Sequence, residues 1–328
     1  MIQKISNEVH AGQGTSEFVL DGNTYCVRVS MADDFGIEAA RRIDIIVPVF
    51  AHNETALQLA MVCLESLRKF SSGKERIWAV DNNSPLAYGR QLFEIPGINI
   101  IRNQTEPRGP RTTQLQQVWR RVTGVIKNSG RHRHTQMWDG SYANAIAIEI
   151  ALKVIGRSAQ KIVTLHSDTV AAQPSWINEF NRHLEGNVKA VGYRKDPGRV
   201  RALHVAGLLV DWPTVRSVKG NFFPSLKNEA QGQMEYDTGD HITVALKRSG
   251  FETRVLNNTY NDPMLANSIT KDDPFRQLNV DRVLDTRGKV VFAHLGRGTS
   301  MASGGKLNSK GVTPLEWVQF IRANVLSN

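Results

Sequence analysis

The segment KIVTLHSDTVAAQPSW, residues 161–176, defines the kind of sheet that this chain can form. Its first part, residues 162–165, is an apolar β-rich run that ends abruptly at His166, Ser167 and Asp168. In an open α/β sheet, ligands bind at the carboxyl ends of the strands, and a carboxylate placed there suits a metal ion and a phosphate. An aspartate also commonly ends a strand or caps a helix, so the segment alone is compatible with both interpretations.

Strands and helices alternate on both sides of this segment. Further apolar β-branched runs predict strands at residues 43–50, 76–85, 98–103, 189–194, 203–212, 253–258 and 289–296. Helical periodicity predicts helices at residues 57–70, 141–156 and 237–250. This alternation predicts an α/β fold with a mainly parallel, doubly wound sheet and right-handed crossovers.

The chain is predicted to have three parts. Residues 1–40 form a small separate β element, a hairpin in which Asp21 and Gly22 supply the turn. Residues 41–304 form the α/β domain. Residues 305–328 form a helical tail that begins at Thr313 and Pro314, and this tail either closes the domain or pairs with a second subunit.

Composition limits the setting and the partners. No stretch is long enough to span a bilayer, the N-terminus lacks the apolar core of a signal peptide, and Cys26 and Cys63 give no metal spacing or disulfide framework. These features predict a cytoplasmic protein. The net charge of +10 predicts an anionic partner, which can be a nucleotide, a nucleic acid, an anionic lipid or an acidic glycan.

Polar side chains stand at four predicted strand ends. They are residues 81–84, residues 166–168, His294, and Phe50 together with His52. Because carboxyl ends of strands meet at one crevice, these groups are expected to converge. The chain has no Walker loop and no G-x-G-x-x-G fingerprint, and Gly296-Arg297-Gly298 is predicted to be a loop that opens no helix.

The order of these motifs resembles that of an inverting family 2 glycosyltransferase with the GT-A fold, over roughly residues 43–300. The motifs are IIVPVFAHNE, WAVDNNSP, DGSYANAIAIEIAL, IVTLHSDT followed by PSW, YDTGDHITVALKRSGFE and VFAHLGRGTS. The resemblance implies a GT-A type open sheet, mixed but mainly parallel and flanked by helices. It also implies a nucleotide-sugar donor such as a UDP- or dTDP-sugar, Mn²⁺ or Mg²⁺ on the donor diphosphate, and a carboxylate base.

Donor-binding roles follow from the resemblance at matching positions. These positions are Pro48, Phe50, Asn53, Asp81, Asn83, Asp139, Gly140, Asn144, Ser167 and Arg297. The residues at 139–144 are expected at the start of a helix, where backbone N–H groups suit donor contacts. Ordinary structural roles are the alternatives: strand packing for Pro48 and Phe50, an Asx-turn for Asp81, a helix cap for Asp139, and a solvated charge for Arg297.

The resemblance assigns the metal ion to Asp168, His166 and His294. Asp168 matches the last acidic residue of the family's Asp-x-Asp motif, whereas His166 replaces the first. If His166 is a ligand, Mn²⁺ suits the site better than Mg²⁺. If His166 instead hydrogen-bonds the ribose or a sugar hydroxyl, the metal rests on Asp168 and His294; a weakened or absent metal site is the third interpretation.

The catalytic base implied by the resemblance is Asp240, with Asp237 as the second choice. Both lie where the family keeps its acidic pair, and the residue that is not the base is expected to cap the helix. The residues that fall where acceptor sites lie in this family are Trp212, Asn221, Phe222 and Phe223, although core packing explains them equally well. Basic residues at 108–111 and 131–134 either contact phosphate or lie in solvated loops.

The function expected from these features is sugar transfer with inversion in the synthesis of a bacterial-type surface glycan, such as O-antigen or capsule. The expected acceptor is a glycan or lipid-linked glycan, reached by peripheral contact at the inner face of the membrane. One alternative is a transferase acting on a nucleic acid, for which the basic charge is the reason. The other is a noncatalytic nucleotide- or glycan-binding module, which the altered motif at His166 favours.

Overall fold

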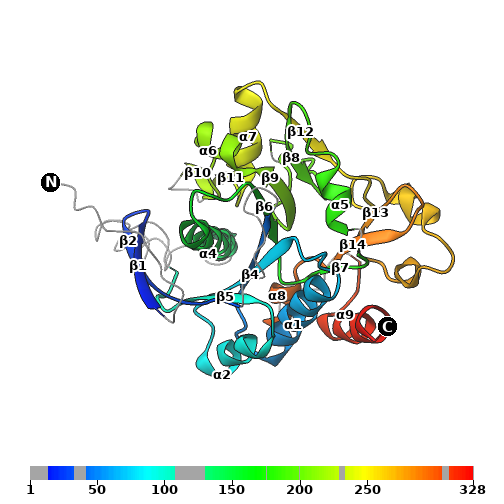
Figure 1. The fold of residues 1–328 in the computed structure, drawn as a ribbon, viewed down its shortest axis with the longest axis horizontal. Helices are drawn as coiled ribbons and strands as arrows, with labels where there is room; N and C mark the ends of the chain where they lie inside the picture. The colour runs from blue at the N-terminus through cyan, green and yellow to red at the C-terminus, as the bar shows by residue number, and fades with distance from the viewer. Residues whose placement is uncertain are drawn as a thin grey trace.

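The computed structural model describes residues 14–32, 42–107, 130–174, 176–198, 200–228, 233–304 and 310–327. Its centre is a nine-stranded sheet with the order β1-β2-β5-β4-β3-β6-β9-β8-β12 (Figure 1). The strands are β1 (Gly14–Leu20), β2 (Asn23–Ser30), β3 (Ile43–Val49), β4 (Glu75–Asn82), β5 (Asn99–Asn103), β6 (Lys161–Leu165), β8 (Val188–Gly192), β9 (Gly207–Asp211) and β12 (Glu252–Val255).

The sheet is mixed but mainly parallel, as predicted. β5, β4, β3 and β6 pair in parallel. β9 is antiparallel to both β6 and β8, so β8 and β12 point in the same direction as β6. In the part of the chain that the structure describes, only β2 and β9 run against the others.

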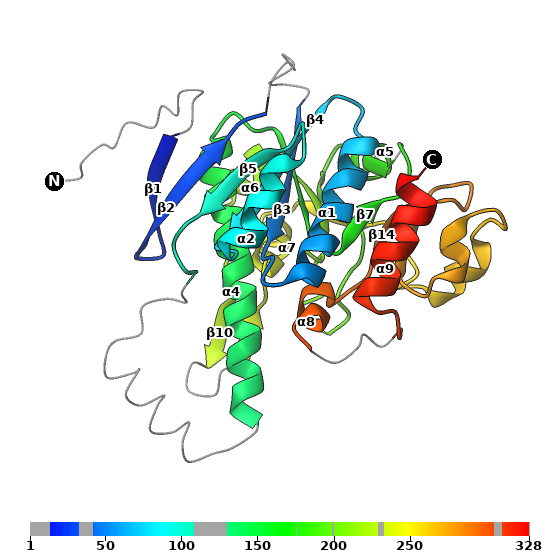
Figure 2. The same ribbon diagram turned by 90° about the horizontal axis from the view of Figure 1, so that it is seen from below.

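Helices cover both faces of the sheet. They are α1 (Glu54–Lys69), α2 (Leu86–Gly89), α4 (Gly130–Ile155), α5 (Trp176–Asn181), α6 (Trp212–Ser217), α7 (Asp240–Arg248), α8 (Gly298–Ala302) and α9 (Pro314–Ile321). Short 3-10 turns η2 (Arg90–Glu94), η3 (Pro263–Ser268) and η4 (Pro274–Gln277), and a final π turn η5 (Arg322–Leu326), complete the helical segments. The first turns of α4 extend beyond the sheet (Figure 2).

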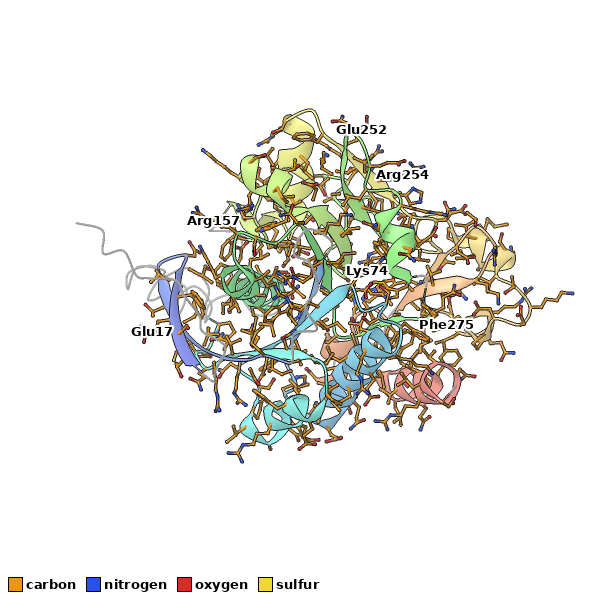
Figure 3. All side chains as sticks on the ribbon, in the orientation of Figure 1. Glu17, Lys74, Arg157, Glu252, Arg254 and Phe275 are labelled. Carbon is orange, nitrogen blue, oxygen red and sulfur yellow. The ribbon has the colours of Figure 1, made fainter. Side chains whose placement is uncertain are left out.

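The alternation of side chains along the strands explains the two layers. On β3, Ile45 and Val47 pack with α1 and α5, whereas Ile46 packs on the opposite face with α4 and α7. A strand buried on both faces needs such a continuous apolar run. Side chains fill the space between the layers, and the charged side chains of Glu17, Arg157 and Glu252 lie at the periphery (Figure 3).

The predicted N-terminal hairpin is present, with its turn at Asp21 and Gly22, but it is not a separate element. β2 pairs antiparallel with β5, and this pairing extends the central sheet by two strands. Tyr25, Val27 and Val29 point inward and join the hydrophobic cluster formed with α4. Inward-facing apolar residues at every second position therefore attach the hairpin to the domain. The boundaries at residues 41 and 304 stay predictions.

The strand predicted at residues 289–296 forms, but it lies outside the central sheet. It is β14 (Val290–His294), the middle strand of an antiparallel sheet with β13 (Asp281–Leu284) and β7 (Thr169–Ala171). Another pair, β10 (Ser225–Asn228) and β11 (Gln233–Tyr236), forms a small ribbon. Because β7 follows β6 after a short turn, the smaller sheet is joined to the end of a central strand.

The C-terminal helix packs on the domain. Trp317 and Ile321 of α9 share a hydrophobic cluster with α1 and with the small sheet, and Thr313 caps the helix with a reciprocal contact from Glu316. Pairing with a second subunit stays a prediction. Among the described residues, no helix combines the length and apolar character needed to cross a bilayer.

Two substitutions of the same kind test whether the hairpin is part of the core. Val27→Ala removes buried methyl groups and is expected to lower the free energy of unfolding by about 1–3 kcal/mol. Val19→Ala, at a position that is 66 % exposed in the same hairpin, is expected to change it by less than about 0.5 kcal/mol. Urea unfolding followed by circular dichroism measures both, and equal small losses would contradict the integrated hairpin.

Candidate functional site

A tight turn at the end of β6 presents the first two polar residues. The amide and the hydroxyl of Thr169 both donate to the carbonyl of His166, at 3.2 and 2.7 Å. This closes the turn so that the chain leaves β6 and enters β7 at once. Asp168 lies between the two strands and is only 4 % exposed. The turn therefore holds a carboxylate at the junction of the two sheets.

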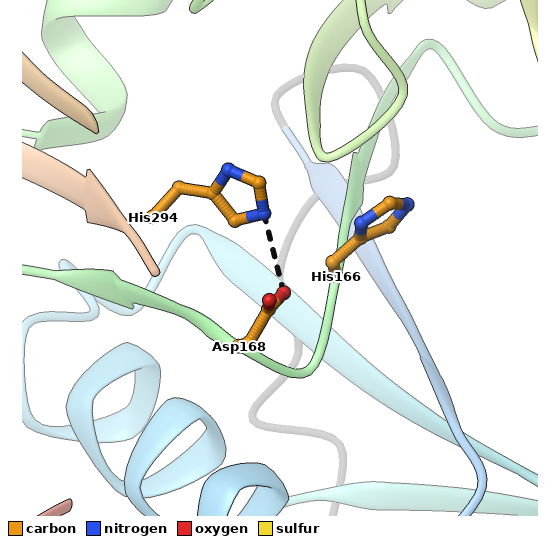
Figure 4. Close-up of side chains that lie close together, drawn as sticks. All are labelled: His166, Asp168 and His294. Atoms are coloured by element: carbon orange, nitrogen blue, oxygen red, sulfur yellow. Dashed lines mark ion pairs between the residues drawn. The ribbon is translucent and has the colours of Figure 1, made fainter. Parts of the chain in front are cut away.

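His294 reaches the same place through strand pairing. In the antiparallel register of β14 and β7, His294 lies opposite Thr169, the residue after Asp168. Its Nε2 is 3.3 Å from Oδ1 of Asp168 (Figure 4). Of the four predicted strand ends, His294 and residues 166–168 do converge, but an antiparallel ladder brings them together, rather than the parallel strand ends on which the prediction relied.

His166 completes a cluster of three metal-ligand types. One ligand atom from each of His166, Asp168 and His294 lies within 4.8 Å of the others. Nε2 of His166 is 3.3 Å from Nδ2 of Asn144 on α4, and its other ring nitrogen lies on the side of Asp168 and His294 (Figure 4). Asn144 therefore lies next to the cluster, and its donor-binding role stays a prediction.

The surroundings of His294 suit a cation between His294 and Asp168. Nδ1 of His294 is 2.7 Å from the hydroxyl of Tyr193 and 3.6 Å from Oδ2 of Asp281. Nε2, which faces Asp168, is buried and has no hydrogen-bond partner in the described protein. If Nδ1 carries the ring hydrogen, a lone pair on Nε2 faces a carboxylate oxygen, and a proton or a metal ion is needed between them.

The pKa shifts agree with this arrangement. Burial disfavours a charged His294, but the carboxylates of Asp168 and Asp281 outweigh it and raise its pKa. Burial alone would raise the pKa of Asp168, yet His294, His166 and the Gly298 amide together lower it. Burial lowers the pKa of His166 to about 4, so His166 is neutral at pH 7. A neutral imidazole and an ionised carboxylate are the forms that bind metal ions, and the shifts of His166 and Asp168 favour these forms. The raised pKa of His294 favours a proton on its ring, which a metal ion has to displace.

These residues fit a divalent metal ion. Two imidazole nitrogens and one carboxylate oxygen suit Mn²⁺ and similar transition metals better than Mg²⁺, which prefers oxygen ligands. The contacts of Tyr193 and Asp281 with Nδ1 are of the kind that orient a metal-binding histidine.

Asp81 lies in a second group, at the end of β4. It is fully buried, its Oδ1 accepts the amide of Ser84 at 3.0 Å, and its Oδ2 is 3.6 Å from Nη1 of Arg102. Burial, its largest effect, raises the pKa of this carboxyl. The turn-forming role considered for Asp81 is therefore present. Asn83 adopts a left-handed backbone with φ of 67°, which places Ser84 for these contacts.

The loop after β3 adjoins this group. The amide of Ala51 donates to Oγ of Ser84 at 2.9 Å, which joins the ends of β3 and β4. Phe50 is 47 % exposed and stacks on His52. Pro48 is half-buried within β3.

The segment after His294 differs from the structure predicted for it. Gly298 does open a helix, the short α8, although a loop was predicted. The amide of Gly298 donates to Oδ2 of Asp168 at 2.7 Å, and an added Cβ would lie 2.6 Å from Cβ of Asp168. Glycine is required here because the backbone approaches the carboxylate so closely. Arg297 has φ of 62° and an exposed side chain.

Helix α8 connects the two groups. At its beginning Gly298 contacts Asp168, and at its end the carbonyl of Ala302 accepts a hydrogen bond from Nδ2 of Asn53 at 2.6 Å. Asn53 also caps α1 through the amide of Ala56. His52 lies 2.8 Å from Oγ of Ser303. The loop after β3 and the Asp168 turn are therefore held by one short helix.

The expectation for residues 139–144 is wrong in one respect. Helix α4 begins at Gly130, so Asp139, Gly140 and Ser141 lie inside the helix, not at its start. Their amides are within the helical backbone, and neither a donor site at a helix N-terminus nor an N-cap by Asp139 or Ser141 forms there. The side chain of Asp139 lies outside the described part, as do residues 108–111 and the side chains at 131–134. Gly140 is exposed.

The acidic pair at α7 has two different environments. Oδ2 of Asp240 accepts the amide of Asp237 at 2.9 Å, and Asp240 is 2 % exposed. Asp237 is half-buried, accepts the amide of Thr238 at 2.8 Å, and lies close enough to His166 to favour its charged form. Thr238 in turn donates to the carbonyl of Ser141 on α4 at 2.7 Å. Asp240 therefore stabilises the turn before α7, and Asp237 lies nearer to the cluster.

The sequence did not reveal Tyr193, Asp281 and His204. Tyr193 follows β8, Asp281 begins β13, and the ring of His204 is 5.5 Å from that of His166. None of the three belongs to a motif. Only the pairing of β13 with β14, in which Asp281 lies opposite His294, brings Asp281 to the site. The polar residues of the run NVDRVLD were the one available signal.

No family model and no curated protein matches this chain. Among solved structures it is similar to the mannosyltransferase PcManGT from Pyrobaculum calidifontis in complex with GDP-Man and Mn²⁺, with 13 % identity and a TM-score of 0.39 over 68 % of this chain. It is also similar to an active-site mutant of LgtC, with 11 % identity and a TM-score of 0.45 over 85 % of this chain and 95 % of that chain. A third similar structure, TarS residues 1–349 from S. aureus in complex with UDP-GlcNAc, has 12 % identity and a TM-score of 0.36 over 58 % of this chain.

The chain spans 57 % of the mannosyltransferase and 51 % of the TarS structure. At these TM-scores and identities, the similarity assigns neither a family nor an activity to this chain.

A glycine substitution tests the contact at Asp168. Gly298→Ala places a methyl group against Asp168 and is expected to lower the free energy of unfolding by about 1–3 kcal/mol and to weaken Mn²⁺ binding. Gly140→Ala is the matched control, because an added Cβ meets nothing there and alanine favours a helix interior by up to about 1 kcal/mol. Urea unfolding and Mn²⁺ titration distinguish the two, and an unaffected Gly298→Ala would contradict the contact.

Proposed function

We propose that this protein is a metal-dependent glycosyltransferase that moves a sugar from a nucleotide-sugar donor to an acceptor hydroxyl. The observation that carries the proposal is the cluster of His166, Asp168 and His294 at the carboxyl end of a central strand of an open α/β sheet. The motif order that resembles the GT-A transferases supports the same class of reaction.

The charges around the cluster favour an anionic ligand. With a divalent ion present, the ion, Arg194 and Lys310 outweigh the carboxylates of Asp168 and Asp281. A low-dielectric site with excess positive charge attracts a polyanion such as a diphosphate. When bound, the metal ion neutralises the charge that develops on the departing diphosphate.

The loop after β3 and the end of β4 form the wall that receives the nucleoside. Phe50 offers an exposed aromatic face for the base. Asp81 stabilises this wall, because its buried carboxylate accepts the amide of Ser84. Asn53 stabilises it as well, because its side chain donates a hydrogen bond to Ala302 of α8.

Asp237 acts as the base in a transfer with inversion. It removes the proton of the acceptor hydroxyl while that oxygen bonds to the anomeric carbon and the bond to the diphosphate breaks. Two observations support Asp237 over Asp240: the Asp240 carboxylate is buried and accepts the amide of Asp237, whereas Asp237 is half-buried. A glycan or lipid-linked glycan is the proposed acceptor.

Asp168→Asn tests the metal role. The amide can no longer bind the ion as a carboxylate does, so we expect kcat/KM to fall by about 100-fold or more. A panel of UDP-, dTDP- and GDP-sugars with Mn²⁺, assayed by release of the nucleoside diphosphate, measures it. Circular dichroism checks the fold, and Asp272→Asn, at an exposed ion pair, is the control. Full activity of Asp168→Asn would show that the reaction does not need a metal ion bound by Asp168.

A second pair of variants separates the two carboxylates at α7. Asp237→Asn is expected to lower kcat by about 10²–10⁴-fold with donor binding unchanged. Asp240→Ala removes the acceptor of the Asp237 amide, so it is expected to destabilise the fold by about 0.5–1.5 kcal/mol and to leave kcat within about tenfold of the native value. NMR of the product reports the anomeric configuration. Retention would refute inversion and the base role of Asp237 but would leave sugar transfer standing.

A further inference from the structure

A buried carboxylate lies directly behind His294. Asp281 of β13 pairs with His294 of β14 in the ladder, and its Oδ2 is 3.6 Å from Nδ1 of His294. The hydroxyl of Tyr193 is 2.7 Å from the same nitrogen. Asp281 is 4 % exposed, so water does not screen its charge from the ring.

Two cations from distant parts of the chain hold Asp281. Nη1 of Arg194, just after β8, donates to Oδ2 at 3.2 Å. Nζ of Lys310, from the segment that leads into α9, donates to Oδ1. Arg194 is itself fixed, because its guanidinium lies 4.3 Å over the ring of Tyr260. Each oxygen of Asp281 therefore has a charged partner, and the carboxylate cannot turn away from His294.

The position of Lys310 is fixed by the C-terminal helix. Thr313 caps α9 three residues later, and Trp317 is fully buried in the cluster that contains Val290 and Ala293 of β14. The helix that anchors Lys310 thus packs on the same strand that carries His294. Lys310 of the C-terminal segment is therefore linked to His294 through Asp281, which contacts both.

The arrangement controls which nitrogen of His294 is available. The Asp281 carboxylate beside Nδ1 favours the tautomer with hydrogen on Nδ1, which the Tyr193 hydroxyl can also accept, and this leaves the lone pair on Nε2, facing Asp168. Without Asp281, the other tautomer can donate from Nε2 to Asp168 across 3.3 Å and occupy both ligand atoms. The orientation needed for a cation therefore depends on Asp281.

We propose that Asp281 and Lys310 are positioning residues for His294, through which the C-terminal segment contributes to binding of the divalent ion. This inference rests on the metal site of the proposed function, but it concerns cation binding, which can be measured without any sugar donor. The series Lys310–Asp281–His294 is called the relay.

The test measures Mn²⁺ affinity of the full chain by electron paramagnetic resonance of the free aqua ion. Asp281→Asn is expected to weaken Mn²⁺ binding by about 10–100-fold, the range for groups that orient a ligand. Lys310→Met is expected to weaken it by a smaller factor, of at least about threefold, and Lys310→Arg to restore most of the loss, because arginine keeps the charge. Such rescue by charge is not expected if Lys310 only packs.

The ion pair of Asp272 and Lys289 is the matched control. Its partners are 3.8 Å apart and are 74 % and 49 % exposed. Asp272→Asn and Lys289→Met should bind Mn²⁺ within about twofold of the native protein, since exposed pairs contribute little. Thermal unfolding without metal checks that each variant folds.

Each result has a distinct meaning. Native-like Mn²⁺ affinity in both Asp281→Asn and Lys310→Met overturns the relay, even if sugar transfer is found. Failure of the native chain to bind Mn²⁺ overturns it as well. If the native chain binds Mn²⁺ and the relay variants lose it, while no nucleotide-sugar in the panel is consumed, the relay stands and the proposed function fails.

Discussion

The site depends on one short ladder, the antiparallel pairing of β7 with β14. Only Phe292, Ala293 and His294 of β14 pair with it, but this register places His294 beside Asp168. The amide of Leu295 extends the contact by donating to the carbonyl of Asp168 at 3.0 Å. A slip by one residue would turn His294 to the other face of the sheet, because side chains alternate along a strand. The hydrophobic cluster between α1, α9 and this sheet opposes such a slip.

The same ladder brings ionisable side chains together in the protein interior, which does not by itself favour folding. Asp168, Asp281 and His294 are all nearly inaccessible to water. Burying ionised groups is costly, and well-packed apolar residues of similar volume often give equal or greater stability than a buried ion pair. The carboxylates have cationic or amide partners, and Nε2 of His294 lies 3.3 Å from Oδ1 of Asp168. This arrangement supports the proposal that a cation binds between these two groups.

The sequence predicted what depends on local pattern and not what depends on register. The β-branched run of β3 and the alternating run of β2 were recognisable because burial on two faces and on one face leave different patterns. His166, Asp168 and His294 were recognisable because polar residues end apolar strands. Joining of the hairpin to β5 depends on pairing across distant segments, and nothing in residues 14–30 specifies the partner. The start of α4 was missed because its first turns are polar and lie beyond the sheet, where no apolar stripe is required.

Asp281 shows why part of a site escapes this kind of prediction. The sequence around Asp281 is that of an ordinary strand. Its role in the site comes from His294, which lies opposite it in the ladder, and from the cations Arg194 and Lys310, which are distant in the sequence. Helix α8 is a second feature that the sequence does not predict. It links two distant segments, because Gly298 contacts Asp168 and Ala302 contacts Asn53. Any movement of the loop after β3 is therefore opposed by hydrogen bonds that end on the Asp168 carboxylate. The wall proposed for the nucleoside and the centre proposed for the metal ion are for this reason linked through α8, although residues 50–53 and 168 follow separate strands.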